Sequence, residues 1–256
     1  MHRDWGHLYR LSVALGIRTL RHGGSLKAGV TRILIPLDPS RYLELPWAER
    51  TLAAARGDRV LDLASPKLLA VSLARSGVDV VSVDVLESEI ELWRRLAPEV
   101  AFEVADGRSL PFADASFDAA YSISVVEHIP DDGDRLALRE LARVVRPGGR
   151  IVLTVPFAAE YWEDWRDDPV YKDEGGSAGR FFFERWYDDE HLDRLLAAAP
   201  VREVSRETVR MEPNWNRRYN KTFPSLLPLG PVFGLLGREV VGPGGDVARL
   251  LLERVR

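Results

Sequence analysis

The stretch from residue 59 to residue 85 constrains the fold of this chain more than any other. Residues 59–63 and 78–83 are short, mostly apolar runs, and residues 66–76 between them have the composition of a helix. Because both runs are apolar nearly throughout rather than alternating, they are typical of parallel strands that helices cover on both faces. The stretch predicts a strand–helix–strand unit with a ligand crevice at the carboxyl ends of its strands.

An aspartate stands at the end of each predicted strand in the first part of the chain. Asp62 and Asp84 end the first two strands, and Asp106 follows a third strand predicted over residues 100–104. An acid about 20 residues after the first turn is at the spacing at which a carboxylate accepts hydrogen bonds from ribose hydroxyls. For each aspartate taken alone, a cap of a strand end or turn is an equally good interpretation.

Alternating strands and helices continue beyond this unit. Helices are predicted over residues 87–96 and 134–145, and strands over residues 119–126 and 150–155, with a tight turn at residues 146–149. Five strands that alternate with helices predict an α/β fold with a doubly wound, mostly parallel sheet.

The domain organisation follows from where this pattern begins and where it fails. Residues 1–45 are expected to be an N-terminal helical extension, and residues 46–256 the main domain, opening with a helix over residues 47–56 that has Pro46 at its start. Lys and Arg outnumber Asp and Glu by nine to four in residues 1–56, which we interpret as a solvated helix face.

Two segments of the main domain lack regular periodicity. Residues 157–187 mix aromatic and acidic residues, and are expected to be either a lid after the fifth strand or a packed surface excursion. Residues 210–246 form an insertion whose apolar part, 223–241, contains several prolines and glycines. That part is expected to pack on the domain, with a pocket cover, a dimer interface and a peripheral membrane contact as the alternatives.

Composition excludes several classes of partner. The 256-residue chain has a formal charge of -4, which gives no reason to expect nucleic acid. It has no cysteine, so disulfides and thiolate metal sites are excluded and a reducing, cytoplasmic location is expected. The apolar run between Arg10 and Arg18 is too short for a secretion signal, and no transmembrane segment is predicted.

Two phrases resemble those of a known family, the class I S-adenosylmethionine-dependent methyltransferases that act on small molecules. They are LPFADASFD at residues 110–118 and RPGG at residues 146–149, and the resemblance covers residues 47–157 and, more faintly, 181–198. It implies a Rossmann-like sheet of seven strands whose last strand is antiparallel, with strands six and seven at residues 201–209 and 247–254. It also implies S-adenosylmethionine as cofactor and a small-molecule or saccharide-like acceptor bound under the 157–187 segment.

The resemblance assigns roles to the residues at the carboxyl edge of the sheet. It places Asp62 near the methionine part of the cofactor, Asp84 at the ribose hydroxyls and Asp106 at the adenine amino group. Carboxylates suit these positions because they accept hydrogen bonds and each of these ligand groups donates them. The other cofactor-binding positions that we predict on this basis are Ala64, Ser65, Val85, Gly107 and Ser124.

The first loop departs from the family pattern. Ala64, Pro66 and Leu68 occupy the positions of the family's glycines, and proline cannot adopt positive φ or offer an N–H. A second account makes Ser65 the N-cap of a helix whose first residue is Pro66. The departure keeps open an alternative function, that of a non-catalytic member whose sheet binds a partner.

Methyl transfer from a sulfonium depends mainly on alignment of the reacting atoms, so a general base is optional. His128, just past the fourth strand, is the candidate base, and the alternative is a loop histidine that bonds the backbone. Some relatives bind a cation through a Glu-x-x-Glu-His cluster at this position. Ser124 replaces the first glutamate here, so no metal site is predicted.

Overall fold

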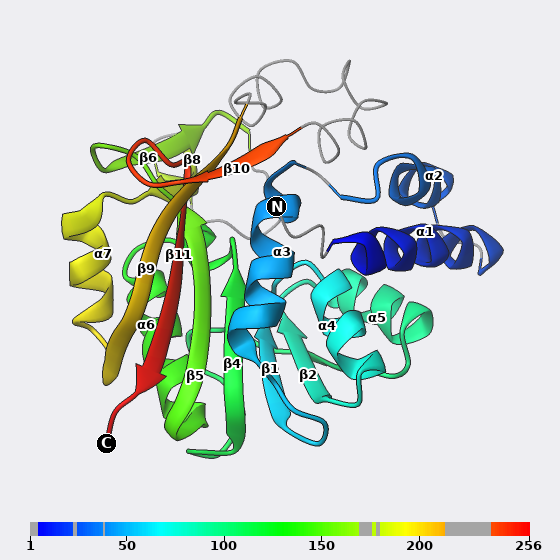
Figure 1. The fold of residues 1–256 in the computed structure, drawn as a ribbon, viewed down its shortest axis with the longest axis horizontal. Coiled ribbons are helices and arrows are strands. Elements are labelled where there is room, and N and C mark those ends of the chain that lie inside the picture. Colours follow the sequence, from blue (N-terminus) through cyan, green and yellow to red (C-terminus); the bar gives the residue numbers. More distant parts are fainter. Residues whose placement is uncertain (1–4, 23–24, 38, 169–175, 178–179, 213–236) are drawn as a thin grey trace.

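A central sheet of eight strands organises the computed structural model, which describes residues 5–22, 25–37, 39–168, 176–177, 180–212 and 237–256. The strand order is β10-β9-β11-β5-β4-β1-β2-β3 (Figure 1). The predicted α/β class with a mostly parallel, doubly wound sheet is confirmed.

The sheet begins with the predicted strand–helix–strand unit. Its elements are β1 (Arg59–Leu63), α4 (Leu68–Arg75), β2 (Asp79–Asp84), α5 (Glu87–Leu96) and β3 (Ala101–Val104). β1 pairs in parallel with β2 on one side and with β4 (Phe117–Ile123) on the other. The chain therefore changes direction across the sheet between β1 and β4, which is where open α/β sheets hold their ligands.

After β4 the chain forms η1 (Val126–His128), α6 (Gly133–Val144) and β5 (Val145–Pro156). The predicted turn at residues 146–149 is a bulge within β5, because Phe117 pairs with Val145 and Ala119 pairs with Arg150. Gly148 has a φ of 76° there, which a side chain would strain.

Three strands complete the sheet: β9 (Val201–Glu212), β10 (Arg238–Val241) and β11 (Val247–Arg254). β11 lies between β5 and β9 and is antiparallel to both, as the resemblance implied for the seventh strand. The sheet has one strand more than the seven expected, because β10 pairs with β9 at the edge. β10 falls within the predicted 210–246 insertion, whose residues 213–236 lie outside the described part.

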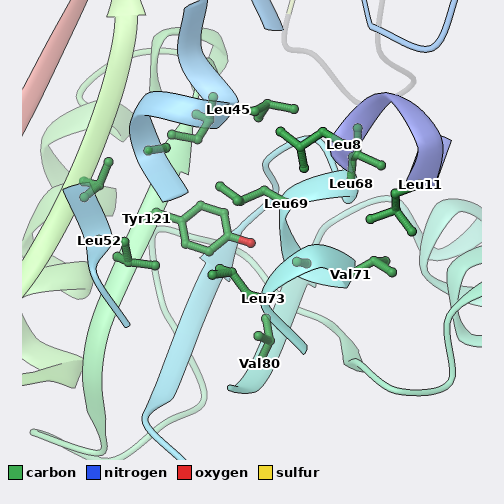
Figure 2. Packing of buried hydrophobic residues seen from close by; sticks show 14 of the residues in the cluster. Leu8, Leu11, Leu45, Leu52, Leu68, Leu69, Val71, Leu73, Val80 and Tyr121 are labelled. Carbon is green, nitrogen blue, oxygen red and sulfur yellow. The ribbon is translucent and has the colours of Figure 1, made fainter. Parts of the chain in front are cut away.

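Helices cover both faces of the sheet and bury two separate sets of apolar side chains. α3 (Pro39–Leu52), α4 and α5 pack on one face, and Figure 2 shows the core there, in which Leu69 of α4 and Tyr121 of β4 are fully buried. α6 and α7 (Asp189–Leu196) cover the other face. No helix among the described residues combines the length and the apolar character needed to cross a membrane.

The N-terminal extension adds two further helices, α1 (Gly6–Arg21) and α2 (Leu26–Leu34). They lie beside α4 and α5 at one edge of the molecule (Figure 1). α1 and α2 cross closely, since a Cβ built on Gly16 would lie 2.8 Å from the carbonyl oxygen of Gly29.

The prediction of a helix over residues 47–56 is wrong at both ends. α3 begins at Pro39 and ends at Leu52, so Pro46 lies inside the helix and the boundary predicted at residue 45 falls within it. An internal proline costs a helix about 3 kcal/mol. Burial of Leu43, Leu45 and Trp47 offsets that cost, at about 2 kcal/mol for each apolar side chain.

Part of the irregular segment after β5 is a small antiparallel sheet of β6 (Trp162–Arg166), β8 (Arg180–Trp186) and β7 (Gly176–Ser177). Trp162 stacks on Trp186 across its strands, with ring centroids 5.4 Å apart. Cross-strand aromatic pairs of this kind stabilise a sheet. The residues of this segment do not alternate between apolar and polar, so its strands were not predicted from the sequence. The role of this segment as a lid stays a prediction.

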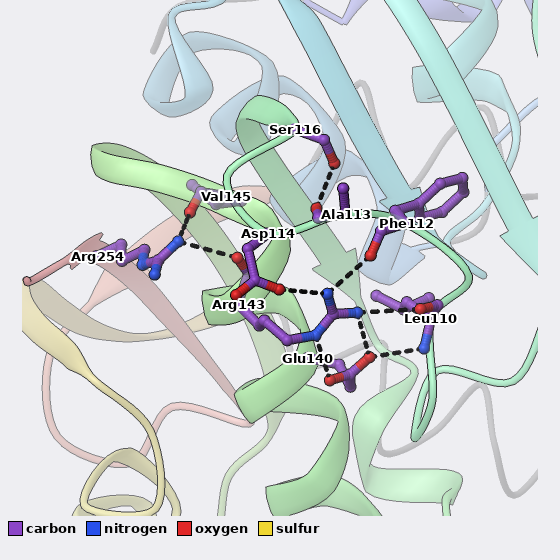
Figure 3. Close-up of polar contacts among 9 residues, drawn as sticks. All are labelled: Leu110, Phe112, Ala113, Asp114, Ser116, Glu140, Arg143, Val145 and Arg254. Carbon is purple, nitrogen blue, oxygen red and sulfur yellow. Dashed lines mark hydrogen bonds and ion pairs between the residues drawn. The ribbon is translucent and has the colours of Figure 1, made fainter.

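Arg143 of α6 fixes the 110–118 phrase in place. Its guanidinium donates to the carbonyl oxygens of Leu110 (3.0 Å) and Phe112 (2.7 Å). It also donates to the carboxylates of Asp114 (2.8 Å) and Glu140 (2.7 Å), as Figure 3 shows. Arg143 therefore joins three residues of the phrase to α6.

Replacing Arg143 by methionine should lower the free energy of unfolding by about 2 kcal/mol, because two backbone carbonyls and two carboxylates lose their donor. Urea unfolding followed by circular dichroism measures this change. The matched control is Arg135→Met on the same helix, which breaks one exposed pair with Asp132 and should cost less than about 0.5 kcal/mol. Equal losses in the two variants would contradict this role for Arg143.

Candidate functional site

A cavity of about 580 Å³ lies at the carboxyl ends of β1, β2 and β4, under the N-terminal helices. Four of the predicted site residues line it: Ala64, Ser65, Asp84 and Ser124. The remaining lining residues are Ser12, Leu15, Thr31, Arg32, Ile35, Pro36, Leu37, Arg41, Leu45, Pro66, Lys67, Leu68, Glu89 and Trp93.

The loop after β1 has the backbone shape of a glycine turn although it contains no glycine. Ala64 has a φ of 51°, in the left-handed region, and its N–H donates to the carbonyl oxygen of Val83 at 2.8 Å. A non-glycine residue in that region is strained by about 1 kcal/mol. The strand-to-helix turn of this domain is thus kept at some cost in stability.

Ser65 is not the N-cap of the following helix, so that account of the loop is wrong. Its hydroxyl accepts a hydrogen bond from the N–H of Ile123 in β4 at 2.9 Å and donates to the carbonyl oxygen of Leu63. Because the side chain is used to join β1 to β4, the helix begins only at Leu68.

Asp62 lies beneath the cavity and does not line it. Its fully buried carboxylate accepts hydrogen bonds from the N–H of Ser65 (3.0 Å) and the hydroxyl of Ser82 (2.7 Å). Burial raises the pKa of Asp62, and the nearby ammonium of Lys67 opposes that rise. Asp62 therefore holds the turn through Ser65, and its carboxylate does not face the cavity.

Lys67 is a buried cation that the sequence interpretation missed. Its Nζ lies 3.3 Å from Oδ2 of Asp84 and 3.7 Å from Oδ2 of Asp62, and its side chain is 6% exposed. Nζ has no hydrogen-bond partner among the described residues. One ammonium thus compensates the two strand-end carboxylates and keeps Asp84 at the cavity wall.

The remaining cofactor positions lie outside the cavity lining. Asp106 pairs with Arg108 at 2.7 Å, and this contact lowers the pKa of Asp106. Gly107 packs on Leu63, whose Cδ1 would lie 2.8 Å from an added Cβ. Val85 is 60% exposed. Of the three aspartates expected around one ligand, only Asp84 lines the cavity, and the roles of the others stay predictions.

Glu44 of α3 is a second residue that the sequence interpretation missed. Its buried carboxylate accepts hydrogen bonds from Arg41 (2.6 Å), Ser124 (2.5 Å) and Thr154 (2.7 Å). Ser124 itself has a φ of 52° at the end of β4. A helix of the N-terminal extension thereby fixes the carboxyl ends of β4 and β5. The sequence signal for this role was the position of Glu44, a charged residue among the mostly apolar residues 42–47.

His128 is held against the small sheet. Its Nδ1 lies 2.7 Å from the carbonyl oxygen of Phe183, which can only accept, so Nδ1 carries the proton and Nε2 is the basic nitrogen. Nε2 lies 3.8 Å from Oε1 of Glu127, a fully buried acid whose pKa burial raises. Burial lowers the pKa of His128. The imidazole is therefore neutral near pH 7, as a base requires, although it does not line the cavity.

A smaller hollow of about 210 Å³ lies apart from this site, against the small sheet. It shares no lining residue with the larger cavity and is bounded by charged and aromatic side chains, among them Asp134, Arg185 and Tyr187. Within the described ranges no cluster of three or more His, Asp or Glu side chains is arranged to hold a metal ion.

Comparison with known proteins adds independent information. Residues 61–153 match the family of methyltransferase domains. The chain is 39% identical over 127 residues to a demethylmenaquinone methyltransferase of Beutenbergia cavernae. This alignment covers 45% of this chain and 52% of that protein. It is 37% identical over 110 residues to an O-methyltransferase of Aspergillus sclerotiorum, covering 40% and 41%.

The fold is also found in a crystal structure of a SAM-dependent methyltransferase from Methanosarcina mazei. That structure has a TM-score of 0.54 at 17% identity, and the match covers 79% of this chain and 94% of that one. The match to the two curated relatives spans about half of their length or less.

Glycine at position 64 should stabilise the protein. Ala64→Gly removes the left-handed strain and should raise the free energy of unfolding by about 0.5 kcal/mol, after the entropy that glycine adds to the unfolded chain. Ala53→Gly is the matched control, since Ala53 also has positive φ (47°) but lies outside the cavity lining. Urea unfolding should show similar gains in both; destabilisation by Ala64→Gly would show that the turn is not strained.

The pH dependence of stability tests the state of His128. A histidine whose folded pKa is lowered contributes stability above its unfolded pKa of about 6.5, and that contribution is lost as pH falls through the folded pKa. Relative to His128→Gln, the wild type should therefore lose unfolding free energy as pH is lowered from about 7 to about 5. Urea unfolding at each pH measures the difference, and a difference that does not change with pH would mean that burial does not govern this imidazole.

Proposed function

We propose that this chain, whose residues 61–153 match the family of methyltransferase domains, binds S-adenosylmethionine in the cavity at the β1–β4 edge and methylates a small molecule there. The observation that carries the proposal is Asp84. Its carboxylate is at the end of β2, lines the cavity and is held by Lys67 and by the N–H of Leu86 (3.1 Å).

The residues of the cavity suit this cofactor. Its volume is within the range of about 300–1,000 Å³ that small-molecule sites have. Asp84 offers acceptors to ribose hydroxyls. Asp106 lies outside the lining and is paired with Arg108, so its contact with the adenine amino group stays a prediction. The left-handed turn at Ala64 has the backbone shape of a glycine turn, and the alanine adds only one methyl group to it. These features support binding despite the missing glycines.

The acceptor that fits this cavity has an apolar body and a small nucleophilic group. Leu15 of α1, Leu45 of α3, and Ile35 and Leu37 between α2 and α3 form an apolar wall. Such a wall favours an aromatic or alkyl acceptor over a saccharide, which would leave hydroxyls without partners. The similarity to proteins named demethylmenaquinone methyltransferase and O-methyltransferase supports the same class.

The chain's own contribution to the reaction is alignment. S-adenosylmethionine, when bound, supplies the methyl group for a direct displacement, whose rate depends on holding nucleophile and methyl carbon in line. Asp84 fixes the nucleoside end, and the helices α1 to α3 fix the acceptor. His128 stays the predicted base for a hydroxyl acceptor, through Nε2, although it lies outside the lining of this cavity, against Phe183 of β8.

Cofactor binding tests the proposal. Isothermal titration with S-adenosylhomocysteine should give measurable heat, and Asp84→Asn should weaken binding at least tenfold, because a charged acceptor is worth about 1.5–3 kcal/mol. Asp79→Asn is the matched control, since Asp79 is exposed at the opposite end of the same strand and should bind as the wild type does.

A folded wild type that gives no heat with either cofactor form would contradict the proposal. That result would favour the alternative, a methyltransferase-fold protein that binds a partner without catalysis, which the Ala64, Pro66 and Leu68 substitutions motivate. Release of S-adenosylhomocysteine with a panel of phenols and hydroxylated quinones then tests the acceptor class.

A further inference from the structure

One outer surface of the N-terminal helices is apolar and exposed. Leu26, Val30 and Leu34 of α2 are 72%, 38% and 56% exposed. Residues four apart lie on the same side of a helix, so these three form one stripe, which we call the α2 stripe. Ile17 of α1 is also exposed, at 40%.

The charged residues that the described part of α1 and α2 carries have one sign. Residues 5–22 and 25–37 contain five cationic side chains and no aspartate or glutamate, although the whole chain has a formal charge of -4. Arg32 points inward, over the ring of Trp93 and toward Thr19. Arg21 and Lys27 are exposed. An apolar stripe with exposed cations on the same pair of helices is the pattern of interfacial helices on anionic lipid.

The opposite side of the same helices forms part of the cavity. Thr31 and Arg32 of α2 line it, and Arg32 lies on the side of the helix away from residues 26, 30 and 34, while the exposed Thr31 lies between the two sides. Ser12 and Leu15 of α1 line it as well. The close crossing at Gly16 and Gly29 holds α1 and α2 together. The α2 stripe is therefore about one helix diameter, roughly 10 Å, from the cavity wall.

We propose that α1 and α2 dock this protein on an anionic lipid surface, with the α2 stripe inserted among the headgroups and Lys27 and Arg21 facing their negative charges. The charges oppose a second copy as the occupant, because two α2 stripes placed face to face would bring cations together without a compensating acid. Nucleic acid would pair with the cations but would leave the apolar side chains of the α2 stripe exposed to water. An anionic lipid surface pairs with the cations and also buries the apolar side chains.

Vesicle binding tests the docking proposal without cofactor or acceptor. Lipid docking can therefore fail while the proposed methyl transfer stands, and methyl transfer can fail while lipid docking stands. The probes are vesicles of mixed phosphatidylcholine and phosphatidylglycerol and vesicles of phosphatidylcholine alone. The full-length protein should sediment with the mixed vesicles and bind the neutral ones at least tenfold more weakly, and added salt should weaken the binding.

The variant Leu26→Ser, Val30→Ser, Leu34→Ser should lose at least tenfold in binding, and Arg21→Glu with Lys27→Glu should abolish the preference for anionic vesicles. The matched control replaces three other exposed apolar residues, Leu136→Ser, Val204→Ser and Val241→Ser, and should bind as the wild type does. Circular dichroism checks that each variant is folded.

Three outcomes would overturn the proposal. One is wild-type protein that stays in solution with both kinds of vesicle. Another is a folded stripe variant that binds as well as the wild type. The third is a dimer, detected by light scattering, that the stripe variant alone abolishes, since the occupant would then be a second copy.

Discussion

The ammonium of Lys67 between Asp62 and Asp84 is the interaction on which the site depends. Two carboxylates that end neighbouring parallel strands repel each other, and burial makes that repulsion stronger. A single cation placed 3.7 Å and 3.3 Å from them compensates both. Lys67 directly precedes α4, and its side chain is buried inside the domain.

The same loop shows how a turn can keep its shape when its usual residue is replaced. Ala64 remains in the left-handed region because its N–H bonds Val83 and because Ser65 is bound to Ile123 of β4. These contacts come from two different strands, so the surrounding sheet imposes the conformation. Glycine makes such a turn easy, whereas tertiary contacts can make it obligatory at a cost of about 1 kcal/mol.

The N-terminal helices are part of the site rather than a separate cap. α3 places Glu44 against the ends of β4 and β5, and residues 15–45 supply apolar side chains that line the cavity. α2 contributes the polar side chains of Thr31 and Arg32 to that lining, while Leu26, Val30 and Leu34 are exposed on its outer side.

The sequence by itself determined the mostly parallel sheet and where its first five strands lie along the chain, because continuous apolar runs and strand-end aspartates are local patterns. It determined β1 and α5 to the residue, and it brought Ala64, Ser65, Asp84 and Ser124 to one edge. Only the tertiary structure decided that α3 runs through Pro46 and which aspartate faces the cavity. Those outcomes depend on burial and on partners far apart in the chain, such as Glu44 with Thr154, and a local pattern carries no information about such distant partners.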